Sequence, residues 1–154
     1  IQNLFKRFVQ NQHLTNHNRA HAMSLNITPI YAAILALLFI FLSINTIKTR
    51  RTHKISIGDG GEKALLRASR VHANFAEYVP FTILLIGILE TQSYSSWIIH
   101  GLSIALIIAR ISHAYGLSQL NENFRFRIFG TSTTLNIMAT CAFLILFKPL
   151  LASA

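Results

Sequence analysis

Long apolar runs separated by short polar segments make up most of this chain. A helix needs about 20 apolar residues to cross the hydrocarbon of a bilayer, and the runs at residues 29–47, 71–89, 97–115 and 128–147 approach that length. Lipid offers no partner for backbone N–H and C=O groups, so each run is predicted to be a helix, which pairs these groups internally. The pattern therefore predicts an all-α membrane protein, a four-transmembrane-helix bundle within residues 23–154.

The composition agrees with a membrane protein. Apolar residues make up 52% of the chain and charged residues 12%, whereas soluble domains carry about 25% charged residues. Small residues inside the runs are expected to let neighbouring helices approach closely. They are Ala32, Ala33, Ala36, Gly101, Ser103, Ala105, Ala109, Gly130 and Ser132. The single cysteine, Cys141, lies in an apolar run and is interpreted as a small buried hydrophobe.

The distribution of charge predicts the topology. The chain has 14 Lys and Arg against 5 Asp and Glu, and the basic residues cluster between apolar runs, which favours a membrane protein over a nucleic-acid partner. The loops at 48–70 and 116–127 hold these clusters, whereas 90–96 has no Lys or Arg. By the positive-inside rule, the two basic loops face the cytoplasm and both termini face the periplasm. Asp59-Gly60-Gly61 predicts a turn in the first loop.

Residues 1–22 are polar and precede Met23. They lack the apolar core of a signal peptide. Two interpretations stay open, a remnant of cloning before a native start at Met23 and a genuine N-terminal extension. The histidines here form an i, i+4, i+8 row that would at most bind a metal adventitiously, so no metal site is predicted.

Polar groups open the second apolar run, in the stretch RASRVHANFAEYVP at residues 67–80. At about 100° per residue, four of them share one stripe about 80° wide. They are Arg67, Arg70, Asn74 and Glu77. His72 points to nearly the opposite side. A carboxylate at membrane depth costs a few kcal/mol unless it is paired, so Glu77 either lines a polar cavity or forms an internal ion pair with Arg67 or Arg70.

Further cations gather at the same membrane level. They are Lys48, Arg50, Arg51, Arg110, His113, Arg125 and Arg127. Arginine donates two-pronged hydrogen bonds to carboxylates, and Glu77 can accept from an ammonium group. A ligand with two carboxylates and one amine therefore matches this cluster. Anchoring against acidic lipids is the alternative, but it leaves Glu77 and Asn74 unexplained.

The same stretch resembles the signature of the MAPEG superfamily, the membrane-associated proteins in eicosanoid and glutathione metabolism. Arg70, His72, Asn74, Glu77 and Pro80 fill the pattern. The resemblance extends over about Met23 to Leu151 and includes the basic first loop and RISHAYG near the end of the third run. The short loops and GDGG look most like the small bacterial branch, which implies the bacterial inner membrane.

The resemblance implies a homotrimer that binds glutathione between subunits near the cytoplasmic boundary. It implies a microsomal glutathione transferase-like protein, which joins or reduces lipophilic electrophiles or lipid peroxides with glutathione. The cofactor-binding candidates are Lys48, Arg50, Arg67, Arg70, Asn74, Glu77, Arg110, His113 and Tyr115. Arg125 or Arg127 matches the fourth-helix residue that stabilises the thiolate. A guanidinium lowers the pKa of a thiol and so activates it as a nucleophile.

The chain departs from the family pattern at three positions. Ala73 stands where several active members have a second arginine, and Leu117 stands where they have a tyrosine. Tyr115 is turned about 200° from His113 unless the helix ends at Gly116. A non-catalytic protein that binds a lipid or an anionic metabolite between subunits is therefore the alternative function. A proton-coupled exporter fits less well, because cations beside Glu77 oppose its protonation.

Overall fold

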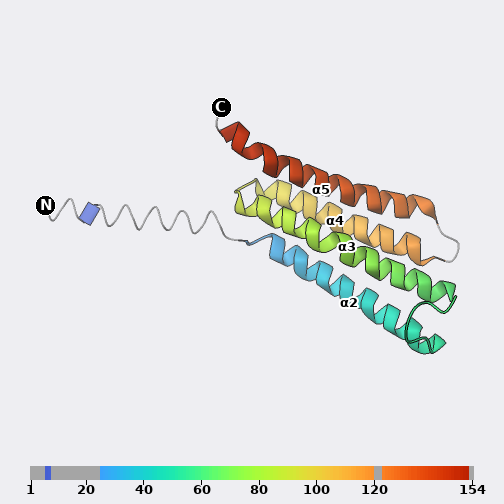
Figure 1. Ribbon diagram of the computed structural model, residues 1–154. Coiled ribbons are helices and arrows are strands. Elements are labelled where there is room, and N and C mark those ends of the chain that lie inside the picture. Colours follow the sequence, from blue (N-terminus) through green and yellow to red (C-terminus); the bar gives the residue numbers. More distant parts are fainter. Residues whose placement is uncertain (1–5, 8–24, 120–122, 153–154) are drawn as a thin grey trace.

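The structure, a computed structural model, describes residues 6–7, 25–119 and 123–152, with side chains as far as residue 148. The interpretations of residues 1–22 therefore lie almost entirely outside the described residues. Four long helices follow one another, α2 at Thr28–His53, α3 at Lys63–Thr91, α4 at Ser96–Ser118 and α5 at Phe124–Ala152 (Figure 1). All 4 are long and apolar enough to span a membrane, and no strand occurs within these ranges. The predicted fold class is confirmed.

The helices extend beyond the apolar runs. Helix α3 begins at Lys63, eight residues before the run that starts at residue 71, and α2 continues to His53. A hydropathy pattern marks only the lipid-embedded part of a helix, whereas backbone hydrogen bonding continues into the polar ends. Arg67 and Arg70 therefore belong to the same continuous helix as Asn74.

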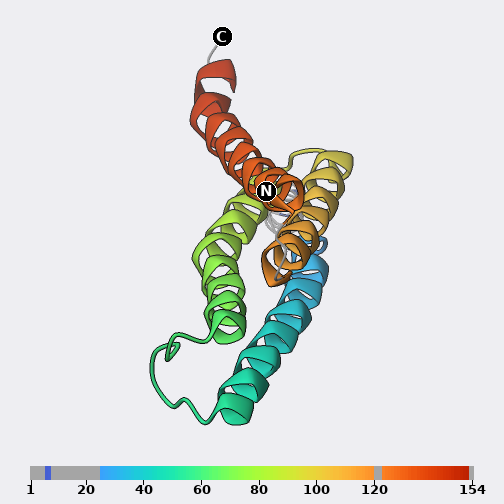
Figure 2. The ribbon, with the colours of Figure 1, turned by 90° about the vertical axis from the view of Figure 1, so that its right-hand side faces the viewer.

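The helices run up and down, with α3 and α4 in the middle, α2 against α3, and α5 against α4 (Figures 1 and 2). Helices α2 and α4 finish, and α3 and α5 begin, at one end of the bundle, which we call the loop end. The basic residues in the last turns of α2 and in the first turns of α3 and α5 therefore gather at one level, as the charge pattern predicted.

The predicted turn at Asp59-Gly60-Gly61 is present. Gly60 and Gly61 have φ angles of +59° and +80°, which favour glycine because it has no Cβ. The N–H of Gly61 donates to Oδ1 of Asp59 at 3.0 Å. This turn directs the chain from α2 into α3.

Helices α4 and α5 approach closely because a glycine stands at the contact. A Cβ on Gly130 would lie 2.5 Å from the carbonyl oxygen of Ala109 and 2.8 Å from the backbone N of His113. Both neighbours are backbone atoms, which cannot move aside independently. Gly130 and Ala109 thus confirm that small residues permit close packing here, whereas a Cβ on Gly101 would meet nothing within 4 Å.

We expect Gly130→Ala to lower the free energy of unfolding by about 1–3 kcal/mol, the usual cost of overpacking. Gly101→Ala is the matched control, because the new methyl group has room and alanine favours a helix by about 0.5–1 kcal/mol over glycine. Thermal unfolding of the detergent-purified proteins measures both. Equal midpoints for the two variants would contradict the close contact.

Glu90, at the other end of α3, caps helix α2. Its Oε1 accepts hydrogen bonds from the N–H groups of Asn26 and Ile27 at 2.6 and 2.7 Å, and its Oε2 accepts from Thr28 at 2.7 Å. The N-terminus of a helix leaves N–H groups without partners and carries partial positive charge. No local side chain caps α2, so Glu90 supplies the partner from 62 to 64 residues away.

Glu90→Ala is expected to destabilise the bundle by about 1–3 kcal/mol, because it leaves buried donors unpaired. Glu90→Gln keeps one acceptor and is expected to lose less. Thermal unfolding in detergent gives the order wild type, Gln, Ala. A glutamine variant that is less stable than the alanine variant would argue against the capping role.

Candidate anion-binding site

A polar cleft of about 570 Å³ lies between α3, α4 and α5 at the loop end. We call it the polar cleft, and the residues that line it are Lys63, Leu66, Arg67, Arg70, Asn74, Tyr78, His113, Leu117, Arg127 and Thr131. Five of the predicted site residues meet here, from three helices. They are Arg67, Arg70, Asn74, His113 and Arg127.

Helical periodicity explains which residues of each helix face the cleft. On α3 the lining positions follow the spacing i, i+4, i+7 and i+11 from Lys63 to Asn74, which keeps them on one face. His113 and Leu117 are four apart on α4, and Arg127 and Thr131 are four apart on α5. Each helix therefore contributes one stripe, and the packing of the three helices brings the stripes together.

The lining is strongly cationic. Lys63, Arg67, Arg70 and Arg127 carry positive charge, and none of the described lining residues is acidic. Arg67 also donates from Nη1 to the carbonyl oxygen of Leu117 at 3.1 Å, near the end of α4, where helix carbonyls lack internal partners. The cleft is thus suited to a ligand with carboxylate or phosphate oxygens.

Arg110 lies beneath the polar cleft and does not line it. Its side chain is 1% exposed, and its Nη2 donates to Oδ1 of Asn74 at 2.7 Å. The same Nη2 lies 3.4 Å from Nδ1 of His113, and the buried Nε has no hydrogen-bond partner among the described residues. The structure therefore places this predicted binding residue one layer below the surface that a ligand would touch.

Glu77 lies outside the polar cleft. Its side chain is exposed, and within the described part of the chain it makes no ion pair with Arg67 or Arg70. Tyr78 follows Asn74 by four residues and lines the cleft, whereas Glu77, which belongs to the same stripe of α3, does not line it. Tyr78 was not predicted as a site residue, although this spacing would have indicated it.

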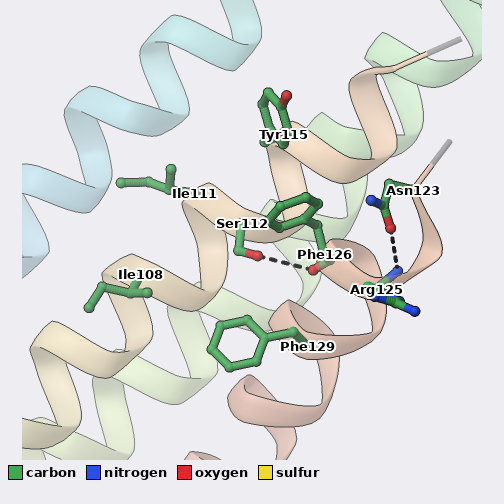
Figure 3. A pocket seen from close by; sticks show the side chains of 8 residues that line it. All are labelled: Ile108, Ile111, Ser112, Tyr115, Asn123, Arg125, Phe126 and Phe129. Atoms are coloured by element: carbon green, nitrogen blue, oxygen red, sulfur yellow. Dashed lines mark hydrogen bonds between the residues drawn. The ribbon is translucent and has the colours of Figure 1, made fainter. Parts of the chain in front are cut away.

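Tyr115 and Arg125 line a different depression, between α4 and α5 (Figure 3). We call it the apolar groove; its volume is about 730 Å³. Its lining residues are Ile108, Ile111, Ser112, Tyr115, Asn123, Arg125, Phe126 and Phe129. The ring of Tyr115 meets that of Phe126 edge-on, with the centroids 5.4 Å apart.

Helical periodicity explains why Tyr115 and Arg125 do not line the polar cleft. Helix α4 continues to Ser118, so Tyr115 stays turned about 200° from His113. Arg125 and Arg127 are likewise two residues apart and face opposite sides of α5. The structure thus brings Arg127 to the polar cleft, and neither Arg125 nor Tyr115.

Helix α2 contributes nothing to the polar cleft within one chain. Arg50 donates from Nη1 to the carbonyl oxygen of Gly58 at 2.8 Å, and Lys48 is exposed. His72 lies on the side of α3 away from the polar cleft, as predicted, and this side faces α2. Its Nε2 lies 3.0 Å from Oγ of Ser43, and its ring stacks on Phe39 with the centroids 4.6 Å apart. His72 therefore joins α3 to α2.

These features define an integral membrane protein, a bundle of four helices with a cationic cleft at one end. The family model described as MAPEG family matches residues 28–147, so the chain belongs to the MAPEG family, and the resemblance seen in the sequence is confirmed. The inner membrane protein YecN of Escherichia coli K12 is 33% identical over 108 residues, which are 70% of this chain and 81% of YecN. YecN of Escherichia coli O6:H1, strain CFT073, matches equally well. No solved structure matches the chain significantly.

Proposed function

We propose that the protein is a glutathione-dependent transferase- or peroxidase-like enzyme, which joins or reduces lipophilic electrophiles with glutathione at the cytoplasmic boundary of the bacterial inner membrane. The observation that carries the proposal is the polar cleft, where four cations and no described acid meet in a MAPEG-family bundle. Glutathione has two carboxylates, and the arginines of the cleft fit them. When bound, it would supply the sulfur nucleophile of the reaction.

Three arginines of the cleft have assigned parts in this proposal. Arg67 and Arg70 lie on one face of α3 and bind the carboxylates. Arg127 lies in the first turn of α5 and lines the same cleft, so its guanidinium favours the thiolate over the thiol. The N-terminus of α5 adds partial positive charge at the same place. No side chain has to form a covalent bond with the substrate.

The lipophilic partner is proposed to lie in the apolar groove. Phe126 lines the groove and the next residue, Arg127, lines the polar cleft. The two sites are therefore separated by the first turn of α5. This arrangement would hold a reactant from the bilayer close to one from the cytosol, which raises their effective concentration.

The remaining candidates fit a homotrimer in which each cleft is completed by a neighbouring subunit. Glu77 is an exposed carboxylate on a membrane helix, and such a group needs a partner because lipid does not solvate it. Lys48 and Arg50 also lie outside the cleft of their own chain. In the proposed trimer these residues approach the open side of the next subunit's cleft, where Glu77 is available for the amine of glutathione.

A second candidate function is a non-catalytic protein that binds a lipid or an anionic metabolite on the same scaffold. The observation that favours it is the position of Tyr115, whose ring contacts Phe126 in the apolar groove. Helix α4 therefore brings Leu117 to the polar cleft, and the phenol that lines the cleft is that of Tyr78, from α3. Binding of glutathione without turnover of a broad panel of electrophiles would support this candidate over the enzyme.

Substitution of the α5 arginine that lines the polar cleft tests the enzyme. Arg127→Met is expected to lower kcat/KM for a general electrophile with glutathione by about 100-fold, the usual loss when one charge-stabilising donor is removed. Arg51→Met is the matched control and is expected to have a far smaller effect, because Arg51 is an exposed cation that lines neither the polar cleft nor the apolar groove. Steady-state turnover by the detergent-purified proteins measures both. Equal losses, or no turnover by the parent protein, would contradict this assignment.

Filling the apolar groove tests the position of the lipophilic partner. Ile111→Trp is expected to lower kcat/KM for a lipophilic electrophile by roughly tenfold or more, because the larger ring occupies the substrate's volume. Glutathione binding, followed by isothermal titration, is expected to stay unchanged. Leu146→Trp is the matched control, since Leu146 is exposed on α5 but lies outside the groove. An Ile111→Trp variant with full activity would place the partner elsewhere.

A further inference from the structure

Arg110 is a buried cation that has an amide as its closest oxygen partner. Its guanidinium donates to Oδ1 of Asn74 at 2.7 Å and is 1% exposed. Within the described residues it has no ion pair with a carboxylate, although its charge is removed from water. Removal of a charge from water without an opposite charge is costly. We therefore ask what the buried guanidinium of Arg110 does that an uncharged side chain would not do.

The contact determines the orientation of the Asn74 amide. A guanidinium has only donors at its N–H groups, so the Asn74 atom that faces Nη2 must be the oxygen. The amide nitrogen, with two hydrogens, is then the group that Asn74 retains for other partners. Asn74 also lines the polar cleft. Arg110 therefore makes Asn74 a donor toward a ligand.

The same Nη2 atom of Arg110 also determines the tautomer of His113. Nη2 of Arg110 lies 3.4 Å from Nδ1 of His113, and this geometry requires Nδ1 to accept. A neutral imidazole that accepts at Nδ1 carries its hydrogen at Nε2. His113, a second lining residue of the cleft, is thereby held in one tautomer.

We infer that Arg110 is a positioning residue that makes the floor of the polar cleft a donor-only surface, selective for an ionised carboxylate over the corresponding neutral amide. The floor consists of Asn74 and His113, whose remaining polar groups are donors. The walls are the cations Lys63, Arg67, Arg70 and Arg127. An amide ligand would direct its own N–H groups at these donors, whereas a carboxylate only accepts. The choice of glutathione as the ligand rests on the proposed function.

The first test compares glutathione with its two mono-amides, each lacking one carboxylate charge. Wild-type protein is expected to bind one of the two mono-amides roughly 10- to 100-fold more weakly than glutathione, the range for a hydrogen bond to a charged group. In Arg110→Met this difference is expected to become several-fold smaller, because the Asn74 amide is free to rotate and to accept, while the cations of the walls still favour the carboxylate. Isothermal titration in detergent measures the affinities.

Arg51→Met is the matched control, since it removes an exposed cation at the same end of the bundle. The control is expected to keep the preference for the carboxylate. A preference that is the same in wild type and in Arg110→Met would overturn the inference, whereas its reduction in Arg110→Met alone would support it.

The second test needs no ligand. In ¹⁵N-histidine-labelled protein, the signals of His113 are those that vanish in His113→Gln. We expect them to show an unprotonated Nδ1 and a protonated Nε2 at neutral pH. Arg110→Met is expected to shift this tautomer balance, and Arg51→Met is not. The opposite tautomer, or an imidazolium, in wild type would overturn the inference even if glutathione binds.

Glutathione binding and the donor-only floor of the cleft can be tested separately. Absence of glutathione binding contradicts the proposed function alone. The donor-only floor is then tested by thermal shift with succinate against succinamide. Stabilisation by succinate only, reduced in Arg110→Met, supports the inference. Equal responses to the two compounds would overturn it.

A second variant covers the case in which Arg110→Met does not fold. Asn74→Asp gives Arg110 a carboxylate partner, so the bundle is expected to stay folded. The new carboxylate presents acceptors and negative charge to the ligand, so glutathione or succinate is expected to bind at least roughly tenfold more weakly. Unchanged binding in Asn74→Asp would contradict a floor of donors.

Discussion

The close contact between α4 and α5 is the constraint on which the arrangement of the site depends. A Cβ on Gly116 would lie 2.9 Å from the backbone N of Arg127 and 2.9 Å from Cβ of Phe126. Together with Gly130, this glycine lets the first turns of α5 rest directly on the backbone of α4. That contact determines the rotation of α5 about its axis. As a result, Arg127 lines the polar cleft and Phe126 lines the apolar groove.

The two sides of this contact differ in charge and polarity. The polar cleft collects cations at the loop end of the bundle, and Arg110 adds a buried charge beneath it. An anion that binds the cleft of the folded protein stabilises the fold, so binding and stability are expected to rise together. The groove on the other side is mostly apolar and faces away from these charges. One helix turn thus separates the cationic cleft from the mostly apolar groove.

The family signature is divided among three surroundings. Arg70 and Asn74 line the polar cleft, His72 packs against Phe39 and Ser43 of α2, and Glu77 is exposed. A single stretch of α3 therefore lines the cationic cleft, holds two helices together and presents a carboxylate outward. Arg110 belongs to the same network from α4, since it contacts the side chain of Asn74. A motif that looks like one binding face in sequence has several separate structural roles.

The sequence by itself determined the number of spans, the gathering of basic residues at one level, the turn at Asp59-Gly60-Gly61 and the family. These follow from hydropathy, charge and local backbone preference, which do not depend on distant contacts. Tertiary structure alone decided that Arg127, and not Arg125, lines the cleft, that Arg110 is buried, and that Glu90 caps α2. Periodicity assigns a side chain to a face of its own helix, but it does not reveal which neighbour that face meets. The rotation and depth of packed helices come from contacts between residues far apart in the chain, and those contacts decide which polar group meets ligand, lipid or another helix.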